Sequence, residues 1–290
     1  MNTISRCQKT FVFSTIIVFL VGCLEVYAQD TIFWYQPDFP PYVIIKGADK
    51  EYGIQNRVNE YLISRLPEYK HTNIKNANYA RILNNLKNQQ QGVIGPIFKN
   101  PEREKFLLYS KHPCFLVLPN GLVVNRNNKK KFNPYILRDG TLDIEALCKL
   151  KKTRIGIVKG RTYKGILDEM INKYQYSKVF TVRHGTDHLG VIKMLLKNRF
   201  DATFGYPIEI KYAGFDSELE VLRIAKMTPY IPSYLAVTKN EWGQTLINKI
   251  NAIMENNDAL AEFYSYYEYW LSETDKTYYQ KYLKEYAEKK

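Results

Sequence analysis

The chain has 290 residues, and its 42 Lys and Arg exceed its 29 Asp and Glu to give a formal charge of +13. This length favours two lobes over a single core. The lysines are scattered, and Lys129–Lys131 is the one run of three. This distribution argues against nucleic acid or an anionic membrane as partner and leaves a diffuse basic surface that favours an anionic ligand. Because the chain has neither a dinucleotide fingerprint nor a phosphate-binding P-loop, no cofactor is expected.

Residues 1–28 have the three parts of a secretory signal: a basic start, an apolar run over 11–21, and a small-residue cleavage site that ends at Ala28. The apolar run is shorter than the about 20 residues that a bilayer-spanning helix needs. We therefore expect export to the periplasm without a stable membrane span. The alternative is a lipoprotein anchored through Cys23, because the preceding Leu-Val-Gly resembles a bacterial lipobox.

Two cysteines, Cys114 and Cys148, remain after the leader. Export makes a disulfide chemically feasible, but nothing in the sequence brings these residues together. Small buried thiols are common, so the sequence favours two free cysteines. Neither their number nor their spacing fits a metal site.

The segment 31–42, TIFWYQPDFPPY, has the pattern of a buried strand that runs into a stiff loop. Its three prolines fix φ and keep the loop extended. Aromatic and polar side chains are thereby placed at the carboxyl end of a strand, where open α/β sheets bind ligands; these are Trp34, Tyr35, Gln36, Asp38, Phe39 and Tyr42. Aromatic walls with a few polar groups describe a small-molecule cleft. The alternative is a loop that pins aromatic residues into the core.

Strands and helices alternate along the rest of the chain. Apolar periodicity predicts helices over 54–66, 79–86, 142–150, 166–174, 187–198 and 246–270, and strands over 92–98, 154–158, 178–182, 201–205, 219–224 and 234–238. Residues 115–124 form a longer apolar run that is broken by Pro119, Asn120 and Gly121. Residues 274–290 are expected to form a surface helix packed through tyrosines. This alternation predicts an α/β fold with mainly parallel sheets.

Three further positions follow predicted strands. Arg103 offers a planar fork of donors for a carboxylate or phosphate, unless it pairs with a neighbouring glutamate. Arg161 and Thr162 lie on a glycine turn before a helix, where unsatisfied N–H groups attract anions, although Thr162 also suits a helix cap. Tyr206 follows the strand 201–205 and could reach a cleft, or it could simply pack in the core.

No catalytic or metal-binding pattern stands out. Ser110 and His112 lie close in sequence but lack a nucleophile elbow. His184 and His188 have a four-residue spacing but no third ligand or zinc-protease glutamate. We therefore expect neither a metal site nor an enzyme.

Several segments together resemble the bacterial extracellular solute-binding proteins of family 3, the polar amino-acid type. The resemblance rests on the leader and, in order, on DFPPY, EYGIQNRVNEYL, NPEREKFLLYS, RIGIVKGRTY and LLKNRFDATFGYP. It implies a type II periplasmic-binding-protein-like fold with two α/β lobes joined by a two-strand hinge. Lobe 1 would comprise residues 29–118 and 228–290, and lobe 2 residues 119–227.

The resemblance also implies roles for the ligand-binding candidates. Arg103 matches the position that binds the ligand carboxylate, Phe39 the aromatic packed on the ligand, and Gln36 a polar position that reads the ligand side chain. Arg161 and Thr162 match the anion-binding turn of the second lobe. We expect Trp34 as a further wall and Tyr206 as a second-lobe contact.

One departure bears on the ligand. The position at which the family has an aspartate for the ligand α-amine is Tyr206 here, and a neutral phenol cannot balance an ammonium ion. The sequence therefore predicts a monomeric binding protein for a small polar anion, an amino acid or an organic acid, with an ABC permease as partner. The alternatives are a ligand sensor, a dehydratase-like enzyme on the same fold, and an envelope protein that binds an anionic polymer.

Overall fold

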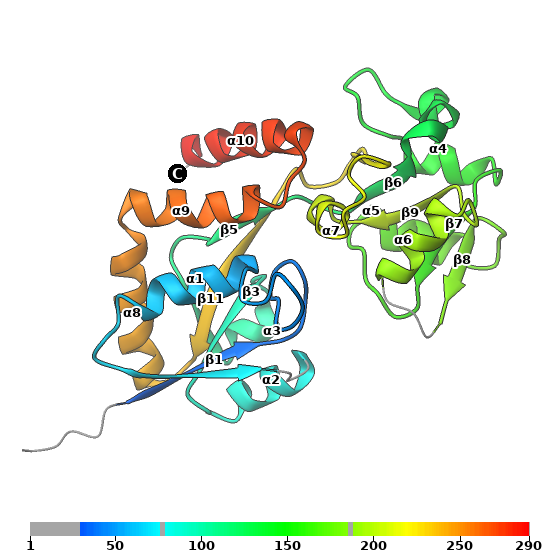
Figure 1. Ribbon diagram of the computed structural model, residues 1–290. Coiled ribbons are helices and arrows are strands. Elements are labelled where there is room, and N and C mark those ends of the chain that lie inside the picture. Colours follow the sequence, from blue (N-terminus) through cyan, green and yellow to red (C-terminus); the bar gives the residue numbers. More distant parts are fainter. Residues whose placement is uncertain (1–29, 76–78, 185–187, 290) are drawn as a thin grey trace, which may run out of the picture.

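A computed structural model describes residues 30–75, 79–184 and 188–289 of the chain. It consists of two α/β lobes, each built around its own sheet, and Figure 1 shows the lobes side by side. The expected leader and Cys23 lie outside the described residues. Within those residues, no helix is both long and apolar enough to cross a bilayer.

The first lobe contains a six-stranded sheet in the order β2-β1-β3-β11-β4, with β5 also paired to β11. Its strands are β1 (Thr31–Gln36), β2 (Lys70–Lys75), β3 (Val93–Ile97), β4 (Leu107–Tyr109), β5 (Phe115–Val117) and β11 (Ile231–Thr238). Strand β1 runs parallel to β2 and β3, whereas β11 is antiparallel to each of its partners. The sheet is therefore mixed.

The second lobe contains a five-stranded sheet in the order β10-β6-β9-β7-β8. Its strands are β6 (Gly121–Asn125), β7 (Ile155–Val158), β8 (Phe180–Arg183), β9 (Ala202–Gly205) and β10 (Leu219–Leu222). Strand β7 is parallel to β8 and β9, while β6 is antiparallel to β9 and β10. In each sheet one strand next to the crossings, β11 or β6, runs against its neighbours while the other strands share one direction, so the expectation of mainly parallel sheets is confirmed.

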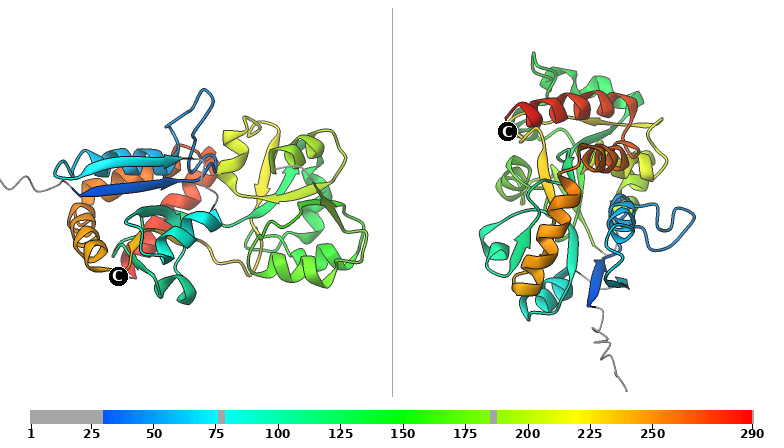
Figure 2. Two further views of the ribbon diagram at one scale, coloured as in Figure 1. Left: turned by 90° about the horizontal axis from the view of Figure 1, so that it is seen from below. Right: turned by 90° about the vertical axis from the view of Figure 1, so that its left-hand side faces the viewer.

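Helices cover the faces of both sheets (Figures 1 and 2). Those of the first lobe are α1 (Ile54–Ile63), α2 (Tyr79–Lys87), α3 (Pro101–Glu104), α8 (Glu241–Met254), α9 (Asn257–Glu268) and α10 (Glu273–Glu288). Those of the second lobe are the 3-10 helix η1 (Arg126–Tyr135), α4 (Ile144–Lys149), α5 (Ile166–Lys173), α6 (His188–Leu196) and α7 (Pro207–Tyr212).

The alternation of side chains along β1 decides which residues enter the core. Ile32 and Trp34 are fully buried among residues of α1 and α9, because side chains two residues apart share one face of a strand. Tyr35 points to the opposite face, where it packs with residues of α2. The central part of β1 is thus committed to packing, and only the loop after it is free to form a binding surface.

Two chain segments, 118–120 and 223–230, cross between the sheets. The first is fixed at its start, where the Leu118 N–H donates to the Tyr267 hydroxyl at 2.9 Å. The predicted lobe boundaries fall inside these two crossings and remain a proposal for where the folding units divide. Cys114 and Cys148 are both buried and unbridged, as the sequence favoured.

Candidate ligand-binding site

A cavity of about 640 Å³ lies between the two lobes. Most of its lining comes from the first lobe, from the loop after β1, the start of α2, the end of β3 and the segment that contains α3: Pro37, Asp38, Phe39, Tyr42, Val43, Tyr79, Pro96, Phe98 and Arg103. Val117 and Ser233 contribute from strands β5 and β11, and Lys164 and Tyr206 close the cavity from the second lobe. The cavity therefore combines aromatic walls with cations from both lobes, which is a composition suited to a small charged ligand.

Arg103 is held at the cavity by the short helix α3. Asn100 caps this helix by accepting from the Arg103 N–H at 2.9 Å, and Pro101 occupies the first helical position. The guanidinium donates through Nη1 to the Phe98 carbonyl at 3.1 Å and lies 5.7 Å from the centre of the Tyr79 ring. Within the described residues, no ion pair involves Arg103. Its charge is thus positioned but not neutralised.

Phe39 forms an exposed wall of the cavity. Its side chain is 44% exposed, and its ring stacks on Tyr42 with centroids 5.2 Å apart. The backbones of Phe39 and Val43 exchange hydrogen bonds of 2.9 and 3.1 Å, which close the proline loop on itself. Tyr42 meets Tyr206 of the second lobe edge-on at 6.4 Å, so aromatic contacts join the two lobes at the cavity floor.

Three phenols line the cavity without adding negative charge. Burial raises the pKa of Tyr79 to about 12, although the nearby Arg103 charge opposes this shift. Burial likewise raises the pKa of Tyr42 and of Tyr206 above the usual value for tyrosine. All three hydroxyls are therefore neutral at pH 7 and are compatible with an anionic ligand.

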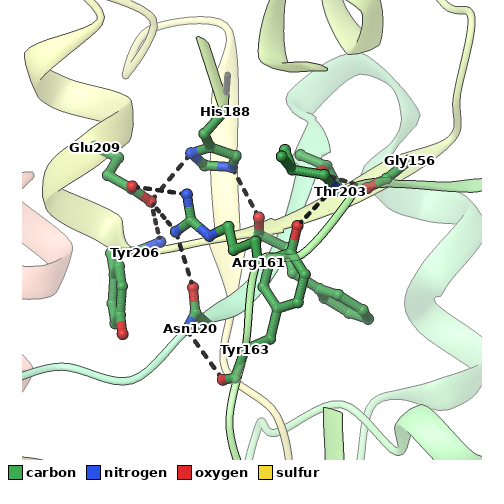
Figure 3. A network of polar contacts seen from close by, with 10 residues as sticks. Asn120, Gly156, Arg161, Tyr163, His188, Thr203, Tyr206 and Glu209 are labelled. Carbon is green, nitrogen blue, oxygen red and sulfur yellow. Dashed lines mark hydrogen bonds and ion pairs between the residues drawn. The ribbon is translucent and has the colours of Figure 1, made fainter. Parts of the chain in front are cut away.

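Behind Tyr206, the second lobe contains a buried ionic network (Figure 3). Glu209 accepts from Arg161 Nη1 at 3.0 Å and from Arg161 Nη2 at 2.8 Å, a two-pronged pairing. His188 Nδ1 lies 3.1 Å from Glu209 Oε2, and the Tyr206 backbone N–H donates to the same oxygen at 2.9 Å. The side chains of Arg161, His188 and Glu209 are 16%, 9% and 9% exposed.

The charges of this network follow from its hydrogen bonds. His188 Nε2 faces the Phe204 carbonyl at 2.8 Å while Nδ1 faces Glu209. Both partners are acceptors, so both ring nitrogens must carry a hydrogen, which makes His188 an imidazolium in this arrangement. Burial alone would raise the pKa of Glu209, but the charges of His188 and Arg161 outweigh burial and hold this pKa well below its usual range.

Local sequence explains why the network forms there. Pro207 starts α7 and Glu209 occupies the third helical position, from which its side chain reaches back to the N–H of Tyr206. Gly205 leaves room for the histidine, because a Cβ at this position would lie 2.5 Å from His188 Cε1. The turn with Arg161 begins at Gly160, which has φ +77°.

Comparison with known proteins is consistent with this geometry. The family model for bacterial extracellular solute-binding proteins, family 3, matches residues 32–273. The chain belongs to this family. Among curated proteins, none matches the sequence.

Solved structures with the same fold include other solute-binding proteins of low sequence identity. A probable amino-acid ABC transporter extracellular-binding protein from Bacillus subtilis is 21% identical, with a TM-score of 0.61 over 81% of this chain and 96% of that one. A putative L-cystine ABC transporter protein from Listeria monocytogenes is 18% identical, with a TM-score of 0.58 over 84% and 97%. A Salmonella typhimurium periplasmic binding protein of high arginine specificity is 19% identical, with a TM-score of 0.54 over 84% and 100%.

The structure brings three of the predicted site residues of this solute-binding protein to one cavity, namely Arg103, Phe39 and Tyr206. Their roles in binding remain a prediction. Trp34 does not reach the cavity: it is fully buried, and its indole N–H donates to His71 Nδ1 at 3.1 Å. The expectation of a Trp34 wall is corrected, because the residue faces the core side of β1.

The other three predicted residues also lie away from the cavity lining. Gln36 is 2% exposed and donates to Asn73 of the neighbouring strand at 3.3 Å. Arg161 turns into the second lobe to meet Glu209, and Thr162 is exposed on the turn. In this structure, the second-lobe turn therefore presents neither of the side chains that the resemblance assigned to the ligand.

Lys164, from the same turn, lines the cavity instead and was not foreseen. Its backbone has φ +75°, and its N–H donates to Asp168 Oδ2 at 3.0 Å. No ion pair among the described residues involves the Lys164 ammonium. Sequence gave no signal for this position, because a lysine in a polar turn is most often an ordinary surface residue. Across the described residues, no group of three His, Cys, Asp or Glu side chains could hold a metal ion.

Proposed function

We propose that this protein captures a small anionic solute, an amino acid or organic acid, between its lobes. The observation that carries the proposal is the aromatic-walled cavity whose lining includes one cation from each lobe, Arg103 and Lys164, neither of which forms an ion pair among the described residues. A carboxylate placed between them would gain charge-assisted hydrogen bonds from both lobes. Because such a ligand contacts more groups when the lobes approach, it favours a closed state.

The proposal includes a cellular role that rests on family membership and on the expected leader. Exported as a monomer to the periplasm, or anchored there through Cys23, the protein would deliver its ligand to an ABC permease. It would bind and release that ligand without chemical change. Glu209, the buried carboxylate of the second lobe, is already held by Arg161 and His188, which supports binding over catalysis.

The experiment begins with a thermal-shift screen of the mature protein against amino acids, organic acids and phosphorylated metabolites. A ligand at 100 times its Kd adds about 2.7 kcal/mol to stability. Calorimetry with a ligand so identified should then show that Arg103→Ala weakens binding by about 1.5–3 kcal/mol, because a charge-assisted hydrogen bond is lost.

Lys105→Ala is the matched control for Arg103→Ala. It removes an exposed cation next to α3 that pairs only with Glu102, at 2.8 Å, and should leave affinity unchanged. Equal affinities of wild type and Arg103→Ala would remove Arg103 from the site. A screen in which only neutral or cationic solutes bind would overturn the anionic ligand.

A further inference from the structure

We infer, on the basis of the proposed function, that the ligand is a carboxylate with an apolar or aromatic body and without an ammonium group. Glu209, the carboxylate behind the second-lobe wall, is already occupied by internal cations. Arg161 and His188 therefore occupy the positions around Glu209 that a ligand amine would otherwise take. Amine-free acids should bind in preference to the corresponding α-amino acids.

The Glu209 carboxylate has no acceptor site left for a ligand ammonium. A carboxylate offers about four lone-pair sites, and Glu209 receives four donors: two from Arg161, one from His188 and one from the Tyr206 N–H. A ligand ammonium could add a bond only by displacing one of them. Displacement of Arg161 or His188 would leave a buried cation without its partner, which is strongly unfavourable.

Among the described residues, the cavity lining has no carboxylate that is free of an ion pair. Asp38 is the one carboxylate among the residues that line it, and Lys46 Nζ lies 3.2 Å from its Oδ2. The cavity cations Arg103 and Lys164 would repel an ammonium rather than pair with it. An amine entering this space would lose water without gaining a free counter-ion.

The cavity walls are suited to an apolar or aromatic ligand body. Aromatic side chains contribute much of the lining, and they come from both lobes: Phe39, Tyr42, Tyr79, Phe98 and Tyr206. The stacked pair of Phe39 and Tyr42 presents a ring face, of which Phe39 is 44% exposed. Such walls favour a flat ring or a branched alkyl chain over a polar one.

The test uses matched acids that differ only in the amine. Calorimetry would compare 3-phenylpropanoate with L-phenylalanine, 4-methylpentanoate with L-leucine, and glutarate with L-glutamate, on the mature wild-type protein at pH 7. We expect the amine-free member to bind about tenfold or more tightly in any pair that binds, because an unpaired ammonium costs at least that factor. The aromatic and branched acids should bind more tightly than glutarate.

A variant identifies the cause of the preference. Arg161→Gln removes one cation from Glu209, so the preference for the amine-free acid should shrink by about tenfold relative to wild type. Arg154→Gln is the matched control, because Arg154 is an exposed second-lobe arginine paired with Asp201 at 3.4 Å, and it should leave the preference unchanged. If Arg161→Gln fails to fold, the wild-type comparison decides alone.

Each outcome is decisive. Tighter binding of the α-amino member, or equal binding of both members, would overturn the inference while leaving an anion-binding protein. An unchanged preference in folded Arg161→Gln would remove the network as its cause. Failure of all six acids to bind would overturn the inference that the ligand is a carboxylate with an apolar or aromatic body, whereas the screen for other anions tests the proposed function separately.

Discussion

At the scale of single residues, Glu209 is a buried carboxylate whose charge is already paired with donors from within the second lobe. Arg161 and His188 supply two positive charges, and the N–H of Tyr206 supplies a further donor. The same contacts fix Tyr206, whose ring forms part of the cavity wall. The network thus joins the stability of the second lobe to the shape of the binding surface.

Glu209→Gln is predicted to destabilise the protein strongly. The change leaves Arg161 and His188 as buried cations without their counter-charge, and breaking a buried ion pair in this way costs about 3–5 kcal/mol. Urea denaturation at pH 7 should show this loss in the free energy of unfolding. Glu218→Gln, an exposed carboxylate of the same lobe, should change it by no more than about 0.5 kcal/mol.

The pH dependence of this difference follows from the lowered pKa of Glu209. A carboxyl whose pKa is lower in the folded state stabilises the protein fully above its unfolded value of about 4.3, and this stabilisation is lost as pH falls toward the folded value. The gap between wild type and Glu209→Gln should therefore narrow below about pH 4.3. A gap that stays constant, or is absent at pH 7, would contradict the assignment.

Part of this network was readable from sequence. The Tyr-Pro-x-Glu order at 206–209 places a proline at the first helical position and a glutamate at the third, which is a helix-start signal. It does not show that Arg161, 48 residues earlier, is the partner. That pairing depends on β7 and β9 being adjacent in the sheet, which local pattern cannot specify.

At the scale of elements, α8 is seated against the end of β11 by a glycine. A Cβ at Gly243 would lie 1.8 Å from the Thr238 carbonyl oxygen, while the Gly243 N–H donates to the capping Asn240 at 2.8 Å. The close approach of α8 to the strand therefore requires a residue without a side chain.

Gly243→Ala tests which of two effects dominates. Helix propensity alone would favour alanine by about 1 kcal/mol, but the clash with the strand backbone must displace α8 or β11, at a cost of about 1–3 kcal/mol. We expect net destabilisation, measured as a lower urea midpoint. Gln244→Ala, at the exposed neighbouring position, should be nearly neutral; a stabilised Gly243→Ala would show that the helix can move freely.

Helices with a regular spacing of apolar residues could be predicted from the sequence, whereas short elements without such a spacing could not. The expected helices over 79–86 and 166–174 correspond to α2 and α5, whereas β2 and α7 were missed. Strand β2 has six residues with no fully buried side chain, so it carries no apolar pattern. The apolar run 115–124 forms two strands, β5 and β6, and the break that begins at Pro119 falls where the chain changes sheets.

The predicted binding residues fall into two groups, those that line the cavity and those whose side chains point elsewhere. Phe39 lies on the loop after β1 and Arg103 on the short helix α3 after β3, and both line the cavity, because the carboxyl ends of strands converge there. Trp34 and Arg161 were assigned by position in a motif, but side-chain direction decides their place. Direction depends on strand face and on distant partners, which a single sequence does not reveal.

At the scale of the whole molecule, charge is divided unequally. Residues 119–227 contain 21 Lys and Arg against 11 Asp and Glu, a formal +10, whereas 29–118 and 228–290 together contain 19 against 17, a formal +2. The second lobe is therefore the main source of the positive field. Such a field raises the local concentration of anions and speeds their encounter with the cavity, in keeping with an anionic ligand.

The C-terminal helix α10 lies above α9 on the first lobe, with its N-terminal end nearest the crossings (Figure 1). It belongs to the first lobe, where Tyr279 is fully buried and its ring lies 4.9 Å from that of Tyr267. Arg223 of the second lobe reaches it: its guanidinium lies 3.7 Å from the Tyr278 ring centre and 3.4 Å from the Tyr282 hydroxyl. A groove of about 350 Å³ separates the rest of α10 from the crossings.

Closing the cavity moves the second lobe relative to the first, and we expect this motion to draw Arg223 away from α10. The contact therefore favours the open state. Its cation–π part contributes about 0.5–1 kcal/mol, so Arg223→Ala should tighten apparent ligand affinity by about two- to fivefold through a larger closed population. Calorimetry with a screened ligand measures this, and Lys284→Ala, which removes an exposed cation from α10 itself, is the control. Weaker binding by Arg223→Ala would instead mean that the contact supports closure.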